Sequence, residues 1–524
     1  MKKQWVTFVL AAVLAASALT GCGADSTEES SQSTADSPES TASTEQELEY
    51  VELDWYLDLG DRPDDDAVNA AFNEYLKEKL NTSVNIHYWA ADEYATKVPT
   101  MVSAGQDMGI LTYNTGLNYV TQSKAGAFYP LEDLMEQYGV GVQGLFSEDI
   151  WNSMTIDGHI YGVPALKDNC YIMNMIYNEE MAEELGLDME NLEFKNWRQN
   201  EEFFTEALAL RDAKYPEFAG QPLINDISME VPFYFAVETF LGNNLAVCNI
   251  DGIDDIAGYD SNTVFSLYAT DEYREFCRMK QRMVANGVYA YDYSNLPDGY
   301  TQGSYLAMSG WGFTYIDDHL YSQDYTTRLK VAENIWTDTN NYTSTGNAIS
   351  ANCANPERAM MVLEEINTDS YLATMLRFGI EGEHWILDDT GKMTFEGTKN
   401  EDPANRGYYF WYGASFGNLT IVNAPESLTG PDNVMLTKIE EYNNSARVPS
   451  HMGFVVDTTP ITNEIAACNN VVAEYANTLA KGQYDSQEAV DAAVDAFNEK
   501  LEANGLSKIL EEIQSQIDAW NSKN

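Results

Sequence analysis

The chain has 524 residues, of which 83 are acidic and 29 are Lys or Arg, so its formal net charge is −54 at pH 7. A charge of this size repels nucleic acid and anionic lipid head groups, and it argues against phosphorylated or polyacidic ligands. The length is sufficient for two large lobes.

The N-terminus has the layout of a secretory signal peptide. Lys2 and Lys3 precede an apolar run over residues 6–19, which is too short and wrongly flanked for a stable membrane span. The run ends in Leu-Thr-Gly-Cys, which resembles the bacterial lipobox, so that residues 1–21 would be removed and Cys22 would be lipidated. An ordinary signal peptide with an accidental cysteine is the alternative. Lipid chains on Cys22 would hold the protein at the membrane surface without spanning it.

Residues 22–48 contain mostly Ser, Thr, Glu, Asp, Gln and Ala, with almost nothing that could enter a core. Such a segment cannot offset its ordering entropy, so we expect a flexible tether. The cysteines that follow are odd in number, far apart and never in a C-x-x-C pair, so they predict buried thiols and neither a disulfide framework nor a zinc site. They are Cys170, Cys248, Cys277, Cys353 and Cys468.

The folded part opens with a strand, a helix and a second strand. Apolar residues alternate over 51–57 and again over 84–88, and between them residues 67–81 show helical spacing behind an aspartate-rich stretch. This βαβ unit predicts a parallel sheet and an α/β fold. A helix from residue 92 to about 104 and a strand within DMGILTY (residues 107–113) follow.

Further helices are predicted over residues 201–218, 269–288 and, in two pieces, 355–379, where Pro356 suits a first helical turn. The C-terminus is helical throughout. The segments 461–482 and 486–505 each end at a glycine in the C-cap position. In the last helix, one apolar stripe is expected: Ile509, Leu510, Ile513, Ile517 and Trp520.

Four segments together are similar to the family 1 extracellular solute-binding proteins of ABC importers, in particular the Gram-positive sugar-binding lipoproteins. The first is IDGHIYGVP followed by the strand YIMNMIYN, although His159 stands where lysine is usual. The second is GQDMGILTYN with KAGAFYPLEDLMEQYG, and the third is PERAMMVLEEIN with GIEGEHWIL. The fourth is the tail from Gly453 to the C-terminus, so the resemblance extends from about residue 50 to the end.

The resemblance implies two α/β lobes, each a mostly parallel sheet flanked by helices, joined by strands that cross more than once. A solute would bind in the cleft between the lobes, and a helical tail would follow. We assign residues 49–168 and 343–390 to the first lobe and residues 169–342 and 391–524 to the second. The implied partners are the transmembrane permease subunits of an ABC importer, the protein itself being an anchored, extracellular monomer that hydrolyses no ATP.

A neutral carbohydrate, and more specifically an oligosaccharide, is the expected ligand. The chain has 10 Trp, 33 Tyr and 20 Phe, and sugars stack on aromatic rings while their hydroxyls bind carboxylates and amides. Ligands of parallel sheets bind beyond the carboxyl ends of the strands. Strand ends, expected crossings and a glycine-flanked tryptophan therefore give the candidate ligand-binding residues: Tyr56, Asp58, Tyr113, Asn114, Tyr119, Lys167, Asp168, Trp311, Trp336, Asp338, Trp411 and Asn418.

Enzymatic alternatives have weaker support. GASFG (residues 413–417) matches the G-x-S-x-G nucleophile elbow of hydrolases, with Ser415 as the nucleophile and His451 as the base. Such an elbow lies between a strand and a helix. YYFWY could serve as the strand, but no helix is predicted after the elbow. A glycosidase needs two carboxylates that face the scissile bond. A chain with 83 acidic residues always contains some such pair, so their presence is no evidence for a glycosidase. We expect no enzyme activity, no cofactor and no metal site. The aspartates of DLGDRPDDD and NIDGIDDIAGYD could hold calcium, but neither segment matches the D-x-[DN]-x-[DN]-G loop, so roles in turns and caps are favoured. A surface adhesin that holds polysaccharide without transport stays an alternative.

Overall fold

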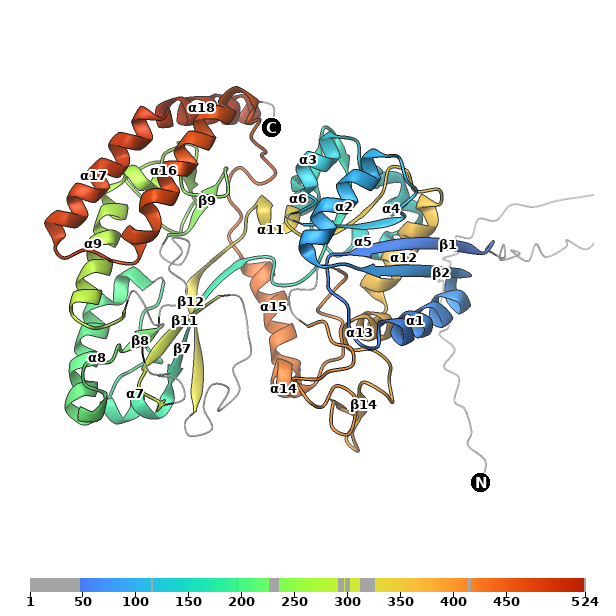
Figure 1. Ribbon diagram of the computed structural model, residues 1–524, viewed down its shortest axis with the longest axis horizontal. Coiled ribbons are helices and arrows are strands. Elements are labelled where there is room, and N and C mark those ends of the chain that lie inside the picture. Colours follow the sequence, from blue (N-terminus) through green and yellow to red (C-terminus); the bar gives the residue numbers. More distant parts are fainter. Residues whose placement is uncertain are drawn as a thin grey trace, which may run out of the picture. The chain divides into compact units, whose positions relative to one another are not determined.

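The computed structural model describes residues 48–114, 116–195, 197–225, 235–290, 296, 302–311, 326–411 and 416–522. The leader, Cys22 and nearly all of the predicted tether therefore lie outside the described residues. From Leu48 onward the chain forms one compact unit (Figure 1). Across these described ranges, none of the helices is both long and apolar enough to cross a membrane.

The first sheet has the strand order β2-β1-β3-β13-β6. Its strands are β1 (Val51–Leu57), β2 (Thr82–Tyr88), β3 (Ile110–Tyr113), β6 (Gly162–Pro164) and β13 (Gly346–Ile349). The predicted βαβ unit is confirmed, because β1 pairs with β2 in parallel and α1 (Asp65–Leu80) connects them. On α1, one face is buried through Val68, Phe72 and Leu76, as the helical spacing predicts.

The second sheet has the order β12-β7-β11-β8. Its strands are β7 (Tyr171–Asn178), β8 (Ile224–Asn225), β11 (Ala307–Trp311) and β12 (Thr327–Trp336). β7 lies antiparallel to both of its neighbours, and in the first sheet β13 lies antiparallel to β3 and β6. The α/β class is confirmed, and so are the mostly parallel sheets, because each sheet contains a single strand that runs opposite to the rest among the described residues, β13 in the first and β7 in the second. Both of these strands enter their sheet after a crossing from the other half of the chain.

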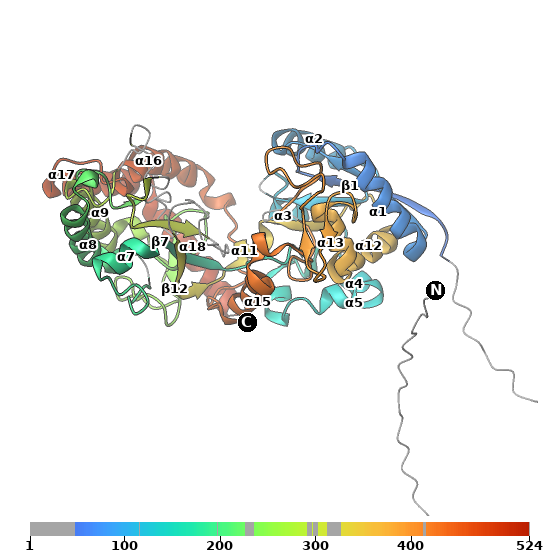
Figure 2. The same cartoon turned by 90° about the horizontal axis from the view of Figure 1, so that it is seen from below.

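Helices cover the first sheet, and those predicted over residues 92–104 and 355–379 lie within a few residues of their expected bounds. On this half of the chain they are α2 (Ala91–Ser103), α3 (Tyr119–Lys124), α4 (Glu132–Tyr138), α5 (Val140–Gln143), α6 (Glu148–Ser153), α12 (Pro356–Thr368) and α13 (Ser370–Phe378). Pro356 is the first residue of α12, where its missing N–H costs nothing. Figure 2 shows α1, α12 and α13 beside β1.

The second sheet is accompanied by α7 (Glu179–Leu185), α8 (Glu201–Lys214) and α9 (Asp271–Ala285), with the short strands β9 (Val237–Thr239) and β10 (Val247–Asn249). The predicted C-terminal helices are confirmed as α16 (Thr462–Ala480), α17 (Gln487–Ala503) and α18 (Leu506–Asn521). Ion pairs tie α17 to α9, from Arg278 to Asp491 at 2.7 Å and from Arg274 to Asp495 at 2.7 Å. The predicted apolar stripe of α18 is buried at Ile509, Ile513 and Ile517.

Two large apolar clusters form the cores of the two halves. One contains Trp55, Phe72 and Ile110 under the first sheet, and the other contains Met175, Phe276 and Ile517 beside the second. The five cysteines of the described chain are all buried and free, as predicted.

A third cluster joins α13 to residues 419–439, which contain α14 (Glu426–Thr429) and the first half of α15 (Val434–Ser445). Cys170 and Ile172 at the start of β7 belong to the same cluster. Tyr408, Phe410 and Phe416 pack in the cluster of the first sheet. The division of the chain into lobes at residues 343 and 391 stays a prediction.

Three segments cross between the two sheets and hydrogen-bond to one another. Residues 165–170 lead from β6 to β7, and residues 337–345, which contain α11 (Thr339–Thr343), lead from β12 to β13. The third segment, 446–453, follows α15. Thr337 donates its hydroxyl to the carbonyl of Asn169 at 2.7 Å and its N–H to the carbonyl of Arg447 at 2.9 Å.

The strand considered for YYFWY is wrong over its described residues 408–411, which are irregular. The N–H of Tyr408 binds the side chain of Asn400 at 3.1 Å, and the N–H of Phe410 binds the carbonyl of Arg377 at 2.7 Å. Because these partners replace a strand ladder, alternating aromatic residues here indicate packing rather than a sheet. Ser415 lies outside the described residues, and the next helix, α14, starts only at Glu426.

Candidate functional site

A cavity of about 690 Å³ lies where the second sheet meets the crossing segments. It is lined by the beginning of β7, the end of β12, α11, the hairpin of β9 and β10, and the segment 454–458 with α16. Val120 of α3 comes from the half of the chain that holds the first sheet. The aromatic residues that line the cavity are Tyr171, Phe235, Phe240, Tyr268, Trp336 and Phe454.

Tyr171 and Trp336 form a stacked pair in this lining. They are opposite each other in the antiparallel pairing of β7 and β12, which places both side chains on one face of the sheet. Their ring centroids are 5.1 Å apart with an interplanar angle of 25°. Trp336 is almost fully buried, whereas Tyr171 is half-buried and can offer ring surface to a ligand.

Asp338 is the one carboxylic acid among the described residues that line the cavity. It is the N-cap of α11, accepting the N–H of Asn341 at 3.2 Å, and it also accepts the hydroxyl of Tyr171 at 3.1 Å. Burial raises the pKa of Asp338 from 3.8 to about 7, and this outweighs the hydrogen bonds, which lower it. The group is therefore close to half-protonated at neutral pH.

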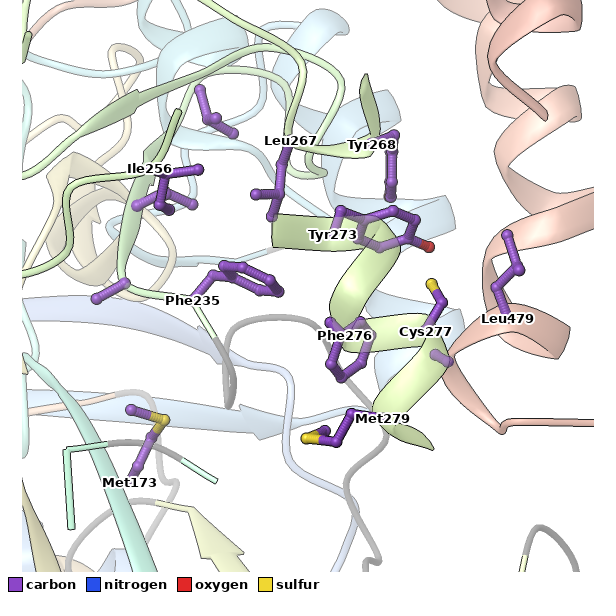
Figure 3. Packing of buried hydrophobic residues seen from close by; sticks show 14 of the residues in the cluster. Met173, Phe235, Ile256, Leu267, Tyr268, Tyr273, Phe276, Cys277, Met279 and Leu479 are labelled. Carbon is purple, nitrogen blue, oxygen red and sulfur yellow. The ribbon is translucent and has the colours of Figure 1, made fainter. Parts of the chain in front are cut away.

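Other lining side chains are held in place by the core around α9 (Figure 3). The ring of Tyr268 meets Tyr273 edge-on at 5.1 Å, and Phe235 meets Phe276 edge-on at 5.7 Å. Figure 3 shows these four residues close to Cys277 and Met279 of the same helix. The cavity is thus backed by a buried aromatic cluster.

The polar part of the lining is rich in amides and hydroxyls. It consists of Thr239, Asn243, Asn244, Asp338, Thr339, Asn340, Thr343, Thr458 and Asn477. None of the lining residues that the structure describes is Lys, Arg or His. Aromatic faces with neutral donors and acceptors suit a ligand that has both apolar patches and hydroxyl groups, and they give an anion no counter-charge.

Of the twelve predicted ligand residues, the structure brings Trp336 and Asp338 together in this cavity. A second group lies at the ends of the first sheet's strands, where Asn114 donates a hydrogen bond to Asp58. Burial raises the pKa of Asp58, and its Oδ1 has no hydrogen-bond partner within the described chain. Tyr56, which is 6% exposed, stacks on His87 with 4.4 Å between ring centroids.

Tyr113 and Tyr119 are fully buried and pack against each other at 4.9 Å. Their hydroxyls donate to the carbonyls of Tyr342 and Met154, at 3.1 and 2.6 Å. Their positions after a strand correctly indicate the edge of the sheet where ligands are expected. Both rings, however, point into the core that joins β3 to α3 and α11.

The remaining predicted residues are dispersed. Lys167 pairs with the buried Asp168 at 3.7 Å in the first crossing segment, and Asn418 lines a separate cavity of about 450 Å³ beside that segment. Trp411 stacks on Phe378 at 5.5 Å in the third cluster. Trp311 lies in β11 opposite Met173 of β7, and its side chain is outside the described set.

Sequence reasoning missed Tyr171, Tyr268 and the contribution of residues 454–480. Tyr171 begins the strand after the first crossing, a position that could have indicated it. Tyr268 lies just before α9 in a 3-10 helix of three residues (Leu267–Ala269), which is too short to give a periodic signal. Residues 454–458 form an irregular stretch that the packing of the C-terminal helices brings to the cavity.

No group of three or more His, Cys, Asp or Glu side chains gathers as a metal site in the part of the chain that the structure describes. His451, considered as a catalytic base, is fully buried. Its Nδ1 lies 2.9 Å from Oε2 of Glu238 and its Nε2 lies 3.2 Å from Oδ1 of Asn262. Both ring nitrogens are thus engaged in packing the segment that follows α15.

Comparison with known proteins identifies the family to which the chain belongs. The profile of the bacterial extracellular solute-binding proteins matches residues 70–379, and that of a domain of unknown function matches residues 450–522. A carbohydrate ABC transporter substrate-binding protein of Streptococcus pneumoniae is 23% identical over 477 residues, which cover 88% of this chain and 89% of that protein.

Solved structures show the same fold. The N-glycan transport solute binding protein of Streptococcus pneumoniae is 20% identical with a TM-score of 0.70, covering 90% of this chain and 99% of that one. An HMO-binding, ABC-transporter-associated protein of Bifidobacterium longum infantis is 15% identical with a TM-score of 0.60, covering 90% and 99%. Together with the family profile, which spans more than half of the sequence, these matches show that the chain belongs to the bacterial extracellular solute-binding proteins.

Proposed function

We propose that the protein captures a neutral oligosaccharide and delivers it to the permease of an ABC importer. The observation that carries this proposal is the lining of the cavity beside Tyr171 and Trp336. Aromatic surface, amides and hydroxyls are abundant there, and the described lining residues include no Lys, Arg or His. Sugar rings stack on aromatic side chains through their C–H faces and bind amides through their hydroxyls.

Relatives support the class of ligand. The curated relative is a carbohydrate transporter's binding protein, and crystal structures of the Streptococcus pneumoniae N-glycan protein contain Man1GlcNAc and Man5GlcNAc. The polar residues at the strand ends of the first sheet, in particular Asp58 and Asn114, would contact the solute from the other lobe. A solute that touches both lobes favours the closed arrangement by its differential affinity.

Anchoring and the absence of catalysis belong to the same proposal. Cys22 would carry the lipid, and the polar segment over residues 22–48 would let the binding protein reach the permease. A bound glycan would be released unaltered, since the protein acts by binding alone.

Calorimetry with neutral disaccharides and longer neutral oligosaccharides tests the function. We expect binding, and we expect Tyr171→Ala to weaken it about tenfold because the variant loses a stacking face. Tyr259→Ala is the matched control, since Tyr259 is 42% exposed and does not line the cavity. Binding of a peptide or an anion, with no response to any sugar, would overturn the carbohydrate assignment.

A further inference from the structure

The C-terminal segment matched to a domain of unknown function contributes one wall of the cavity. Phe454, Val455, Val456 and Thr458 line it from the irregular stretch after the third crossing, and Ala476, Asn477 and Ala480 line it from α16. These residues lie in the C-terminal part of the chain, beyond the 70–379 match.

This wall is fixed from behind by α18. Gln516 forms a two-point clamp on the backbone of Asp457, whose N–H donates to Oε1 at 2.8 Å and whose carbonyl accepts Nε2 at 2.9 Å. Trp520 packs against Phe454 with 6.1 Å between ring centroids. Since Asp457 stands between the lining residues Val456 and Thr458, Gln516 sets the position of both.

The wall is also joined to the strand on its other side. His451 binds Glu238, and the neighbours of Glu238 in β9, Val237 and Thr239, line the same cavity. The ring of Phe240 meets Phe454 edge-on at 5.7 Å. The C-terminal wall and the β9 hairpin therefore form one continuous surface.

Asn477 is the polar group that this wall offers to a ligand. It is exposed, it lines the cavity from the last turn of α16, and its side-chain amide makes no hydrogen bond within the described chain. An amide presents two donors and an acceptor, which match vicinal hydroxyl groups of a sugar.

We propose that residues 450–522 form a selectivity wall for the solute, with Asn477 as a ligand contact and Gln516 as the positioning residue. This inference rests on the proposed function, because it assigns to that region a part in choosing which oligosaccharide the cavity accepts. A longer glycan extends over more of the cavity than a disaccharide and therefore depends more on this wall.

Calorimetry on the full-length folded chain with a neutral disaccharide and a neutral pentasaccharide tests it. We expect Asn477→Ala to weaken pentasaccharide binding about fivefold, corresponding to one lost hydrogen bond, and to change disaccharide binding less. Asn470→Ala, on the same helix, is exposed and outside the cavity lining, so it should bind both sugars as the wild type does.

Gln516→Ala should likewise change the ratio of the two affinities. Gln514→Ala is its matched control, because Gln514 clamps the backbone of Val264 and Asn262 in the same way, at 2.8 and 3.0 Å, but that loop does not line the cavity. A merely structural role would lower the melting temperature of both glutamine variants and leave the affinity ratio constant. Wild-type affinity ratios in both Asn477→Ala and Gln516→Ala would overturn the selectivity wall, whereas a wild type that binds no sugar would overturn the proposed function and this inference with it.

Discussion

Asp338 has a structural role at the edge of the cavity that we propose binds the solute. It caps α11 and bonds to Tyr171, yet it also lines the cavity. The titratable groups facing it are Tyr171 and, at longer range, Glu238, whose negative charge further raises the pKa of Asp338. Burial makes the ionised form costly, so that the folded protein retains the proton to about pH 7 while the unfolded chain loses it near pH 4.

We predict that Asp338→Asn removes a pH dependence of stability. Between about pH 4 and pH 7 the unfolded state releases a proton that the folded state keeps, so the wild type loses free energy of unfolding as the pH rises. The side chain of the variant cannot titrate. From the low to the high end of this pH range, the free energy of unfolding of the variant should therefore rise by more than about 1 kcal/mol relative to that of the wild type. Urea denaturation at pH 4.5 and pH 7.5 measures it.

The exposed Asp432 provides the control, because 94% of its side chain is accessible. Asp432→Asn should follow the wild type at both pH values. Parallel curves for the wild type and Asp338→Asn would contradict the assignment of the titration to this group.

Residue positions were predictable from sequence where the chain leaves a sheet. Trp336 and Asp338 were expected at the return crossing, and both line the cavity. Tyr113 and Tyr119 were chosen for an equally good reason, but a strand end does not determine where a ring points. The carbonyl that binds Tyr113 belongs to Tyr342, which lies in the second crossing segment far along the chain.

At the scale of elements, Arg377 of α13 holds the irregular region that follows it. Its guanidinium donates to the carbonyls of Trp411 at 3.2 Å and Phe416 at 2.9 Å, and it lies 5.0 Å from the ring centre of Phe416. Burial lowers the pKa of Arg377 to about 10, so it stays charged at neutral pH. Arg377 and Asn400, which binds Tyr408, together replace the strand ladder that the aromatic pattern of residues 408–411 would suggest.

We predict that Arg377→Met lowers the free energy of unfolding by about 3 kcal/mol, because it leaves buried carbonyls without a donor. Chemical denaturation measures the change. Arg328→Met is the control, since 44% of the Arg328 side chain is exposed and its ion pair with Glu179 contributes little. Equal losses in the two variants would contradict the role given to Arg377.

Elements with strong periodicity were predictable, as β1, α1, β2 and the C-terminal helices show. Local patterns specify these elements because one face of each is buried. The direction in which a strand enters its sheet was harder to predict from the sequence. β13 enters the first sheet antiparallel because it follows a crossing, and no pattern within Gly-Asn-Ala-Ile records that.

For the whole molecule, we predict that Cys22→Ala releases the protein from the membrane or leaves its precursor uncut. The expectation follows from the Leu-Thr-Gly-Cys sequence at the end of the apolar run. Fractionation of cells with detection of the precursor size measures it. Cys170→Ala, a change at a buried thiol, should leave anchoring and processing unaltered. An anchored and normally processed Cys22→Ala protein would exclude the lipobox.

We further predict that a bound oligosaccharide both stabilises and compacts the protein. At a concentration one hundred times the dissociation constant, it should add about 2.7 kcal/mol to the free energy of unfolding. Small-angle scattering should show a smaller radius of gyration, because a solute held by both lobes favours closure. The Tyr171→Ala variant at the same sugar concentration is the control. Stabilisation without compaction would place the solute on one lobe alone.

The strand order has a consequence for assembly during synthesis and export. The first sheet needs β13, so it cannot be completed until residue 349 has been delivered, by which time the strands of the second sheet are already available. The core of the second sheet, in turn, includes Ile517 of α18. Neither half can therefore mature before its neighbour has begun, and the last helix to emerge completes a core begun hundreds of residues earlier. The core beside the second sheet therefore stays incomplete until α18 has been delivered.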